Sequence, residues 1–210
     1  MSASGRGLLI AALLAPVALA ACGGARTAGP PPAAGPANMS AAEIEALFRA
    51  RKDSARAQFT EADVRFMTGM IHHHAQAIEM SQMAPTHGAS SSIRTLAARI
   101  INAQRDEINR MQRWLGDRGL TVPEVEINPE GVMVHGADHA MHMPGMLMPG
   151  MLTPEQMREL DAASGTSFDR LFLTFMIQHH EGAVTMVHEL FATDGAAQGD
   201  LVFKLASDVQ

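Results

Sequence analysis

The sequence predicts an all-α protein, a four-helix bundle made of two repeated helical hairpins. Long stretches carry apolar residues at helical spacing, with helix start and stop signals at their ends, and no stretch convincingly predicts a strand. The third observation is an internal repeat, in which 63–83 aligns without gaps on 169–189 at an offset of 106. The identical pairs are Asp63/Asp169, Phe66/Phe172, Thr68/Thr174, Met70/Met176, Ile71/Ile177, His73/His179, His74/His180, Ala77/Ala183 and Met80/Met186. Because each copy predicts one hairpin, two copies make four helices.

The N-terminal residues 1–21 are predicted to be a lipoprotein signal peptide. Arg6 precedes an apolar stretch, 8–20, which is too short for a membrane span of about 20 residues. Small residues then precede Cys22, in a pattern that resembles the bacterial lipobox, so we expect Cys22 to be lipidated. An ordinary signal peptide with an incidental cysteine is the alternative. The prediction is an exported lipoprotein, anchored in a membrane and facing the periplasm or the cell exterior.

A flexible linker and an accessory helix are predicted before the main domain. Residues 22–39 are rich in Gly, Pro and Ala, as in a tether, and Ser40 begins a helical stretch over 40–58. Cys22 is the only cysteine, so the domain has neither a disulfide nor a thiolate ligand for a metal.

The main domain, 60–210, begins at a capping box, Thr60 to Asp63. Its predicted helices span about 60–83, 90–115, 153–163 and 168–192, with a last one from about 198, and an irregular connector, 120–152, joins the two hairpins. The second copy ends at Gln210, the counterpart of Gln104, so either the chain is a fragment or the second copy is degenerate.

The composition excludes some partners and raises one question. A formal net charge of −6 without a basic face makes nucleic acid an unsuitable partner. A hydrophobic fraction of 47% is enough for one modest core, and hence for a single domain. The chain has 16 Met and 10 His but no Tyr, and so many thioethers and imidazoles call for an explanation.

Both copies of the repeat place histidine and methionine on the helix face that should point inward. At about 100° per residue, the matched residues span roughly a third of the helix circumference. They are Met70, His73, His74, Ala77 and Met80 in the first copy, and Met176, His179, His180, Ala183 and Met186 in the second. These side chains could be plain core filler, but buried imidazoles need partners, and a metal ion would serve all four together.

Copper is the metal that these ligands favour. Thioethers and imidazoles without thiolates prefer Cu(I), while histidine and glutamate also accept Cu(II). We therefore predict a copper site of His73, His74, His179 and His180 with Met70, Met80, Met176 and Met186. Glu107 and Met111, on one face of the following helix, are weaker candidates. His72, His87 and His188 are expected to be solvated surface residues.

The connector offers a second, compositional candidate for copper capture. His135, His139 and His142 alternate there with methionines that include Met141 and Met143. The alternative is a loop whose methionines simply cover one end of the bundle.

The motifs resemble those of a secreted bacterial family, the domain of unknown function numbered 305. The resemblance rests on the doubled MIxHHxxAxxM motif, on QRDEINRM, and on PGMLTPEQM before GTSFDRLFLTFMIQHHEGA. It covers about 60–210 and implies a ferritin-like helical bundle with CopM-type copper-binding relatives. It also implies copper binding at the periplasm or cell surface, with the paired histidines and flanking methionines at the motif positions.

Three functions remain open at this point. The first is extracytoplasmic copper binding, for sequestration, tolerance or handover to a copper chaperone or efflux partner. The second is a ferritin-like di-iron enzyme, which the absence of Glu-x-x-His on the long helices disfavours. The third is a metal-free structural lipoprotein. We expect the first, a binding protein and not an enzyme.

Overall fold

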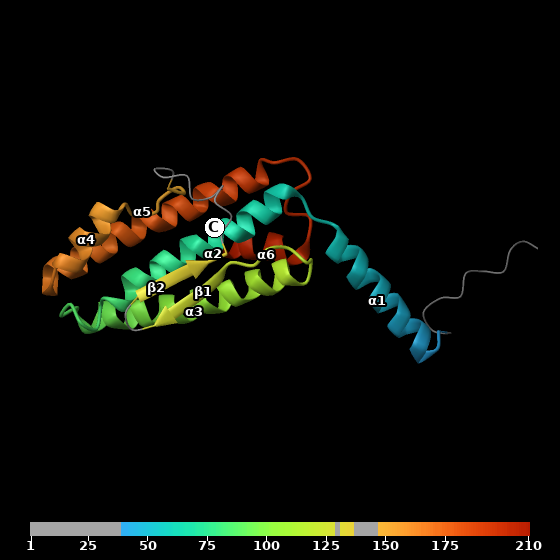
Figure 1. Ribbon diagram of the computed structural model, residues 1–210, viewed down its shortest axis with the longest axis horizontal. Coiled ribbons are helices and arrows are strands. Elements are labelled where there is room, and N and C mark those ends of the chain that lie inside the picture. Colours follow the sequence, from blue (N-terminus) through green and yellow to red (C-terminus); the bar gives the residue numbers. More distant parts are fainter. Residues whose placement is uncertain (1–38, 129–130, 137–146) are drawn as a thin grey trace, which may run out of the picture. The chain divides into compact units, whose positions relative to one another are not determined.

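The computed structural model describes residues 39–128, 131–136 and 147–210 (Figure 1). The predicted signal peptide, Cys22 and most of the linker lie outside this range. The first element is helix α1 (Ala41–Ala57). As predicted, Ser40 caps this helix, because its hydroxyl oxygen accepts from the Glu43 backbone N–H at 3.3 Å.

Two long helices form the first hairpin, α2 (Glu61–Gln82) and α3 (Ser91–Gly116). The predicted capping box at Thr60 is present, since its hydroxyl accepts from Asp63 N while the Asp63 carboxylate accepts from Thr60 N. Asp63 is buried, and its other oxygen accepts from the backbone N–H of Ala197 at 2.7 Å. One carboxylate therefore fixes both the start of α2 and the turn before the last helix.

Replacing Asp63 by alanine should lower the free energy of unfolding by about 2 kcal/mol, because it removes a helix cap and leaves a buried N–H without an acceptor. Urea denaturation would measure the loss. Asp106→Ala, at an exposed carboxylate of α3, is the control and should change the free energy by less than about 0.5 kcal/mol. Equal stability of the two variants would contradict the double role of Asp63.

Helix α4 (Pro154–Ala162) precedes the second hairpin, which consists of α5 (Gly165–Phe191) and α6 (Asp200–Val209). The Thr153 cap with proline at the first helical position is confirmed. Helix α2 packs on α3 and α5, and α5 packs on α4 and α6. Figure 1 shows that α2 and α5 run side by side in opposite directions. This mostly helical architecture agrees with the sequence, which predicted five helices from Thr60 onward at these places.

The expectation of no strands is wrong. Strands β1 (Glu124–Asn128) and β2 (Gly131–His135) pair antiparallel, with Val125 opposite Val134 and Ile127 opposite Val132. An isolated two-stranded hairpin is marginal in water, so helix packing must support it. Val125, Ile127 and Val132 pack against the main apolar cluster, and β2 contacts α2. The connector was predicted to be irregular because it is rich in Met and His, and the short alternation of β-branched residues in β1 and β2 was therefore not recognised.

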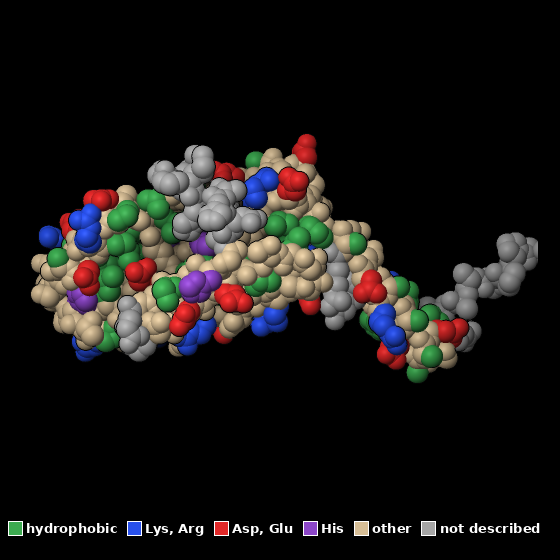
Figure 2. All heavy atoms as spheres, viewed as in Figure 1, with side chains coloured by type: hydrophobic (Ala, Val, Ile, Leu, Met, Phe, Trp, Pro, Cys, Tyr) green, Lys and Arg blue, Asp and Glu red, His purple; other side chains and the backbone are tan. Residues whose placement is uncertain are grey.

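The described surface is mixed in charge and offers no membrane-spanning element. Figure 2 shows acidic and basic side chains interspersed over the visible face. Across residues 39–128, 131–136 and 147–210, none of the helices combines the length and apolar character that crossing a membrane requires.

Candidate metal centre

The two long repeat helices meet at a pair of closely packed histidines, His73 and His179, whose rings are tilted by 40°. The ring centroids of His73 on α2 and His179 on α5 are 3.8 Å apart, and the two residues are only 0% and 1% exposed. His74 and His180 flank the pair. All four histidines border one cavity of about 190 Å³, together with Gln104, Glu107 and Ala183. The structure thus brings together the imidazoles that the repeat predicted.

Three of these rings are anchored through one nitrogen. His73 Nε2 donates to the carbonyl oxygen of Pro149 at 3.0 Å, and His180 Nδ1 donates to that of Met176 at 2.8 Å. His74 Nε2 lies 2.7 Å from the Glu107 carboxylate. Since a carbonyl oxygen only accepts, the proton of His73 is on Nε2 and that of His180 on Nδ1. Metal-binding histidines are commonly oriented by such contacts to carbonyl or carboxylate oxygens.

Three of the four histidines also have a ring nitrogen that is buried without a hydrogen-bond partner: His73 Nδ1, His74 Nδ1 and His179 Nε2. The side-chain oxygen of Gln104, on the same cavity, is in the same state. Each unpaired buried polar atom costs about 1–3 kcal/mol. These unpaired atoms belong to residues that border one cavity, and nitrogen lone pairs of this kind are suitable ligands for a positive ion.

Burial keeps the side chains of His73 and His179 uncharged. Desolvation is the main cause that lowers the pKa of His73 to about 4, and repulsion from His74 and His180 adds to it, while the Pro149 carbonyl opposes it. Desolvation and then repulsion from His73 lower the pKa of His179 to about 2. At neutral pH both rings are therefore neutral, the form that binds metals.

The predicted methionines lie in two apolar clusters that include opposite ends of the α2–α5 pair. Met70, Met186 and Met111 belong to one cluster, and Met80 and Met176 to the other. Because α2 and α5 are antiparallel, Met70 of one copy shares a cluster with Met186 of the other, and Met80 with Met176. All five thioethers are buried.

His180 does not point fully inward as predicted. It borders the cavity but is an exposed residue, whereas its repeat counterpart His74 is buried. Helix α3 supplies Glu107, which pairs with His74. On the side of α6, Asp208 borders the cavity.

Sequence reasoning missed Asp208 as a cavity residue. Its repeat counterpart is Asn102, which is exposed on α3, so comparison of the two copies gave no signal for this position. Asp208 also pairs with Lys204 Nζ at 2.8 Å, one turn earlier on α6. A second carboxylate therefore lies at the border of the cavity, in addition to Glu107.

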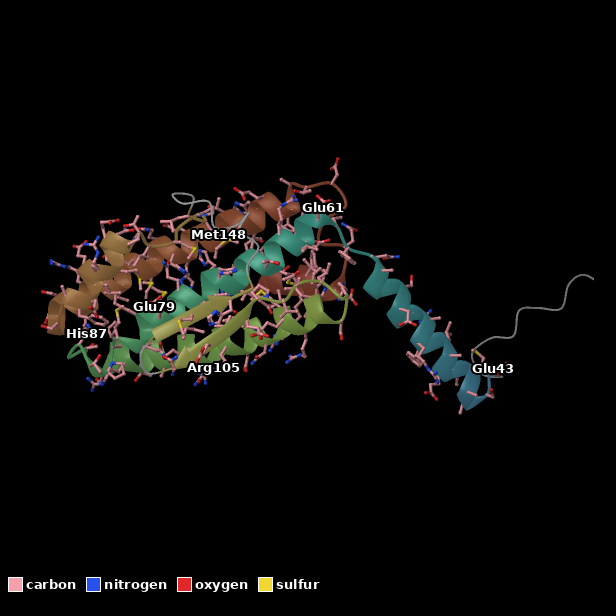
Figure 3. All side chains as sticks on the ribbon, in the orientation of Figure 1. Glu43, Glu61, Glu79, His87, Arg105 and Met148 are labelled. Carbon is pink, nitrogen blue, oxygen red and sulfur yellow. The ribbon has the colours of Figure 1, made fainter. Side chains whose placement is uncertain are left out.

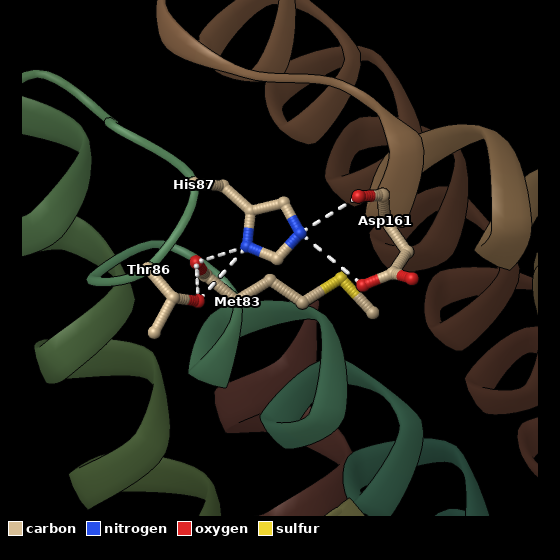
Figure 4. Close-up of polar contacts among 4 residues, drawn as sticks. All are labelled: Met83, Thr86, His87 and Asp161. Atoms are coloured by element: carbon tan, nitrogen blue, oxygen red, sulfur yellow. Dashed lines mark hydrogen bonds and ion pairs between the residues drawn. The ribbon is translucent and has the colours of Figure 1, made fainter.

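Two histidines expected to be solvated are wholly or partly buried. His72 is buried because the β-hairpin and the segment before α4 also cover α2. Gln82 of α2 donates to Asn128 O in the β-hairpin, and Gln76 donates to Leu152 O in the segment before α4. His87 is half-buried and links the α2–α3 turn to α4 (Figure 4). Its Nδ1 lies 2.8 Å from Met83 O and its Nε2 2.8 Å from Asp161 O. His188 is exposed, as expected.

The connector candidates are only partly described. His135 is exposed at the end of β2, with Nε2 3.8 Å from the Glu126 carboxylate. His139, His142, Met141 and Met143 lie outside the described residues.

Within the described part of the chain, no three side chains of His, Cys, Asp or Glu already converge on a point where they could hold a metal. Methionine sulfur, the other ligand type that the sequence predicts, is not among those four. None of the predicted methionines is among the residues that line the cavity, so a bound ion would require the rings or the thioethers to move.

Two solved structures are similar to this chain over most of its length. One is a protein designated as secreted from Streptomyces coelicolor, with 28% identity, 70% of this chain and 82% of that chain covered, and a TM-score of 0.56. The other is CopM in a Cu(II)-bound form, with 28% identity, coverage of 70% and 84%, and a TM-score of 0.50.

One curated relative, the uncharacterized protein L153 of Acanthamoeba polyphaga mimivirus, is 40% identical over 58 residues. That match spans 28% of this chain and 38% of the relative, well under two thirds of its length. The profile of one family matches residues 63–210, which include both copies of the repeat and all the residues around the cavity. The chain therefore belongs to the family described as domain of unknown function DUF305.

Proposed function

We propose that this protein binds copper outside the cytoplasm, through the paired histidines and methionines of its repeat. The observation that carries the proposal is the set of three buried ring nitrogens without partners, on histidines that border one cavity. Two of them belong to rings whose pKa is lowered by burial to about 4 and about 2, so protons do not compete with a metal there at neutral pH.

The ligand types favour copper over other ions. Imidazole nitrogen with thioether sulfur suits Cu(I), and Glu107 beside His74 adds a ligand that Cu(II) accepts. Magnesium and calcium prefer a shell made mainly of oxygen ligands, whereas histidines are four of the seven polar residues that border this cavity. The similarity to CopM, which was solved with bound Cu(II), supports the same metal for this chain.

The cellular role that we propose is sequestration or handover of copper at the cell envelope. One similar protein is designated as secreted, which supports export. The proposal includes anchoring through a lipidated Cys22 and exchange of copper with a chaperone or efflux protein. It also includes a ferritin-like bundle formed by α2, α3, α5 and α6. Helix packing of α2 on α3, α2 on α5 and α5 on α6 supports the last point.

Competition titration of the purified protein with a Cu(I) chelator tests the function. We expect binding that is weakened at least about 100-fold when His73, His74, His179 and His180 are all replaced by alanine, since every imidazole of the cavity is then lost. The matched control replaces His87 and His188, which do not border the cavity and are not predicted ligands, and it should bind as the natural protein does.

Far-UV circular dichroism establishes that both variants are folded. Equal copper affinity in the two variants would rule out the cavity as the copper site. Metal analysis separates the other functions: bound iron with oxidase activity would favour a di-iron enzyme, and the absence of any bound metal would favour a structural protein.

A further inference from the structure

A short segment crosses the α2–α5 pair beside His73 and His179. We call residues 148–152 the strap. Met148, labelled in Figure 3, lies where the strap reaches the two helices, and the carbonyl of the next residue, Pro149, accepts a hydrogen bond from His73 Nε2. The strap, which directly precedes the Thr153 cap of α4, therefore contacts the centre of the repeat.

Two glutamines hold the strap. Gln76, about one turn after His73, both accepts from Leu152 N at 2.8 Å and donates to Leu152 O at 3.0 Å. From α5, Gln178 donates to Gly150 O at 3.3 Å. The pairing of Gln76 with both backbone groups of one residue fixes the position of the strap along α2.

On the α5 side, the close approach of the strap to the helix depends on two glycines, Gly150 and Gly182. A Cβ added at Gly182 would overlap the carbonyl group of Pro149, and one added at Gly150 would lie 2.7 Å from Gly182 Cα. Gly150 also has a φ of 75°, which L side chains rarely adopt. Gly182 is the repeat counterpart of Gln76, so one copy binds the strap at this position and the other makes room for it.

We infer that the strap selects the ligand atom of His73: because the Pro149 carbonyl accepts a hydrogen bond from Nε2–H, Nδ1 carries the lone pair that faces a metal. Gln76 and Gln178 are then positioning residues, which act on the metal through the strap and His73. The metal part of this inference rests on the proposed function. The tautomer of His73 does not, and it can be measured without copper.

NMR of protein labelled with ¹⁵N-histidine measures that tautomer in the metal-free state. We expect the proton of His73 on Nε2 in the natural protein. Gln76→Ala removes both bonds to Leu152, and Gln178→Ala removes the bond to Gly150; each should give a mixture of tautomers at His73. Cu(I) affinity should fall about 10- to 100-fold in Gln76→Ala, as when other orienting contacts of metal ligands are removed.

The matched control is Gln112→Ala. Gln112 is also half-buried and donates to a backbone oxygen, that of Pro123, at 2.8 Å, but it holds a different loop. The control should leave the tautomer and the copper affinity unchanged, which separates the strap from a general loss of packing.

The outcomes distinguish the role of the strap from the proposed function. A proton on Nδ1 of His73 in the natural protein would overturn the inference, as would an unchanged tautomer in both strap variants. If the tautomer responds as expected but the natural protein binds no copper, the proposed function fails and the role of the strap in fixing His73 stands.

Discussion

The free energy of unfolding is expected to fall by about 3 kcal/mol when the pH is lowered from about 6.5 to about 5, because two histidines are buried uncharged. An exposed histidine of the unfolded chain takes up a proton near pH 6.5. In the folded protein, burial lowers the pKa of His73 to about 4 and that of His179 to about 2. Between these values the unfolded chain binds more protons, so acid favours unfolding.

The pH range follows from the same values. Above about pH 6.5 both rings are neutral in both states and add no pH dependence. Below it, each ring contributes a slope of up to about 1.4 kcal/mol per pH unit. The contribution of His73 levels off near pH 4, where the folded protein also binds the proton, while that of His179 continues towards pH 2.

Urea denaturation at several pH values between about 7 and about 5 measures this slope, and His179→Leu tests its origin. Leucine is close to histidine in volume and removes one unpartnered buried nitrogen, so the variant should be about 1–2 kcal/mol more stable at neutral pH. Its slope should be about half that of the natural protein, because one of the two rings is gone.

His188→Leu, at an exposed histidine of the same helix, is the control and should keep the full slope. A free energy of unfolding that does not change between neutral pH and about pH 5 would show that the rings of His73 and His179 are not buried in solution. The expected gain in stability with loss of a proposed ligand is typical of functional sites, where polar groups are kept at a cost.

Local sequence signals predicted the helices well, because their ends depend on neighbouring residues. The capping box of Thr60 and the start signal at Thr153 and Pro154 involve residues within one helical turn, so they can be recognised without knowledge of the fold. The repeat added the long-range information that His73 and His179 occupy equivalent inward positions, and in the structure their rings pack closely together.

The remaining features depend on contacts between distant segments. The β-hairpin is stabilised by packing of Val125 and Ile127 on the helices, which no local pattern reveals. The burial of His72 also depends on segments that cover α2 from elsewhere in the chain. A usable signal lay at two of the positions where the copies differ: Gln76 corresponds to Gly182, and His72 to Gln178. Gln76 and Gln178 are the residues that bind the strap.

Gly182→Ala is expected to lower the free energy of unfolding by about 3 kcal/mol, although alanine is the better helix former by about 1 kcal/mol. The added methyl group would overlap the backbone of Pro149, and neither that backbone nor α5 can yield as a flexible side chain would. Either the strap is displaced, or α5 moves away from α2 and the rings of His73 and His179 separate.

Urea denaturation measures the loss, and hydrogen exchange shows where it arises. The Leu152 N–H, which donates to Gln76, should exchange faster in Gly182→Ala if the strap is displaced, while amides of α3 should keep their protection. Gly116→Ala is the matched control, since Gly116 is also helical and an added Cβ would meet only Val122 Cγ2, at 3.7 Å. The control should be neutral or stabilised by up to about 1 kcal/mol. If Gly182→Ala behaves like this control, the strap does not lie against Gly182 in solution, and its hold on His73 fails with it.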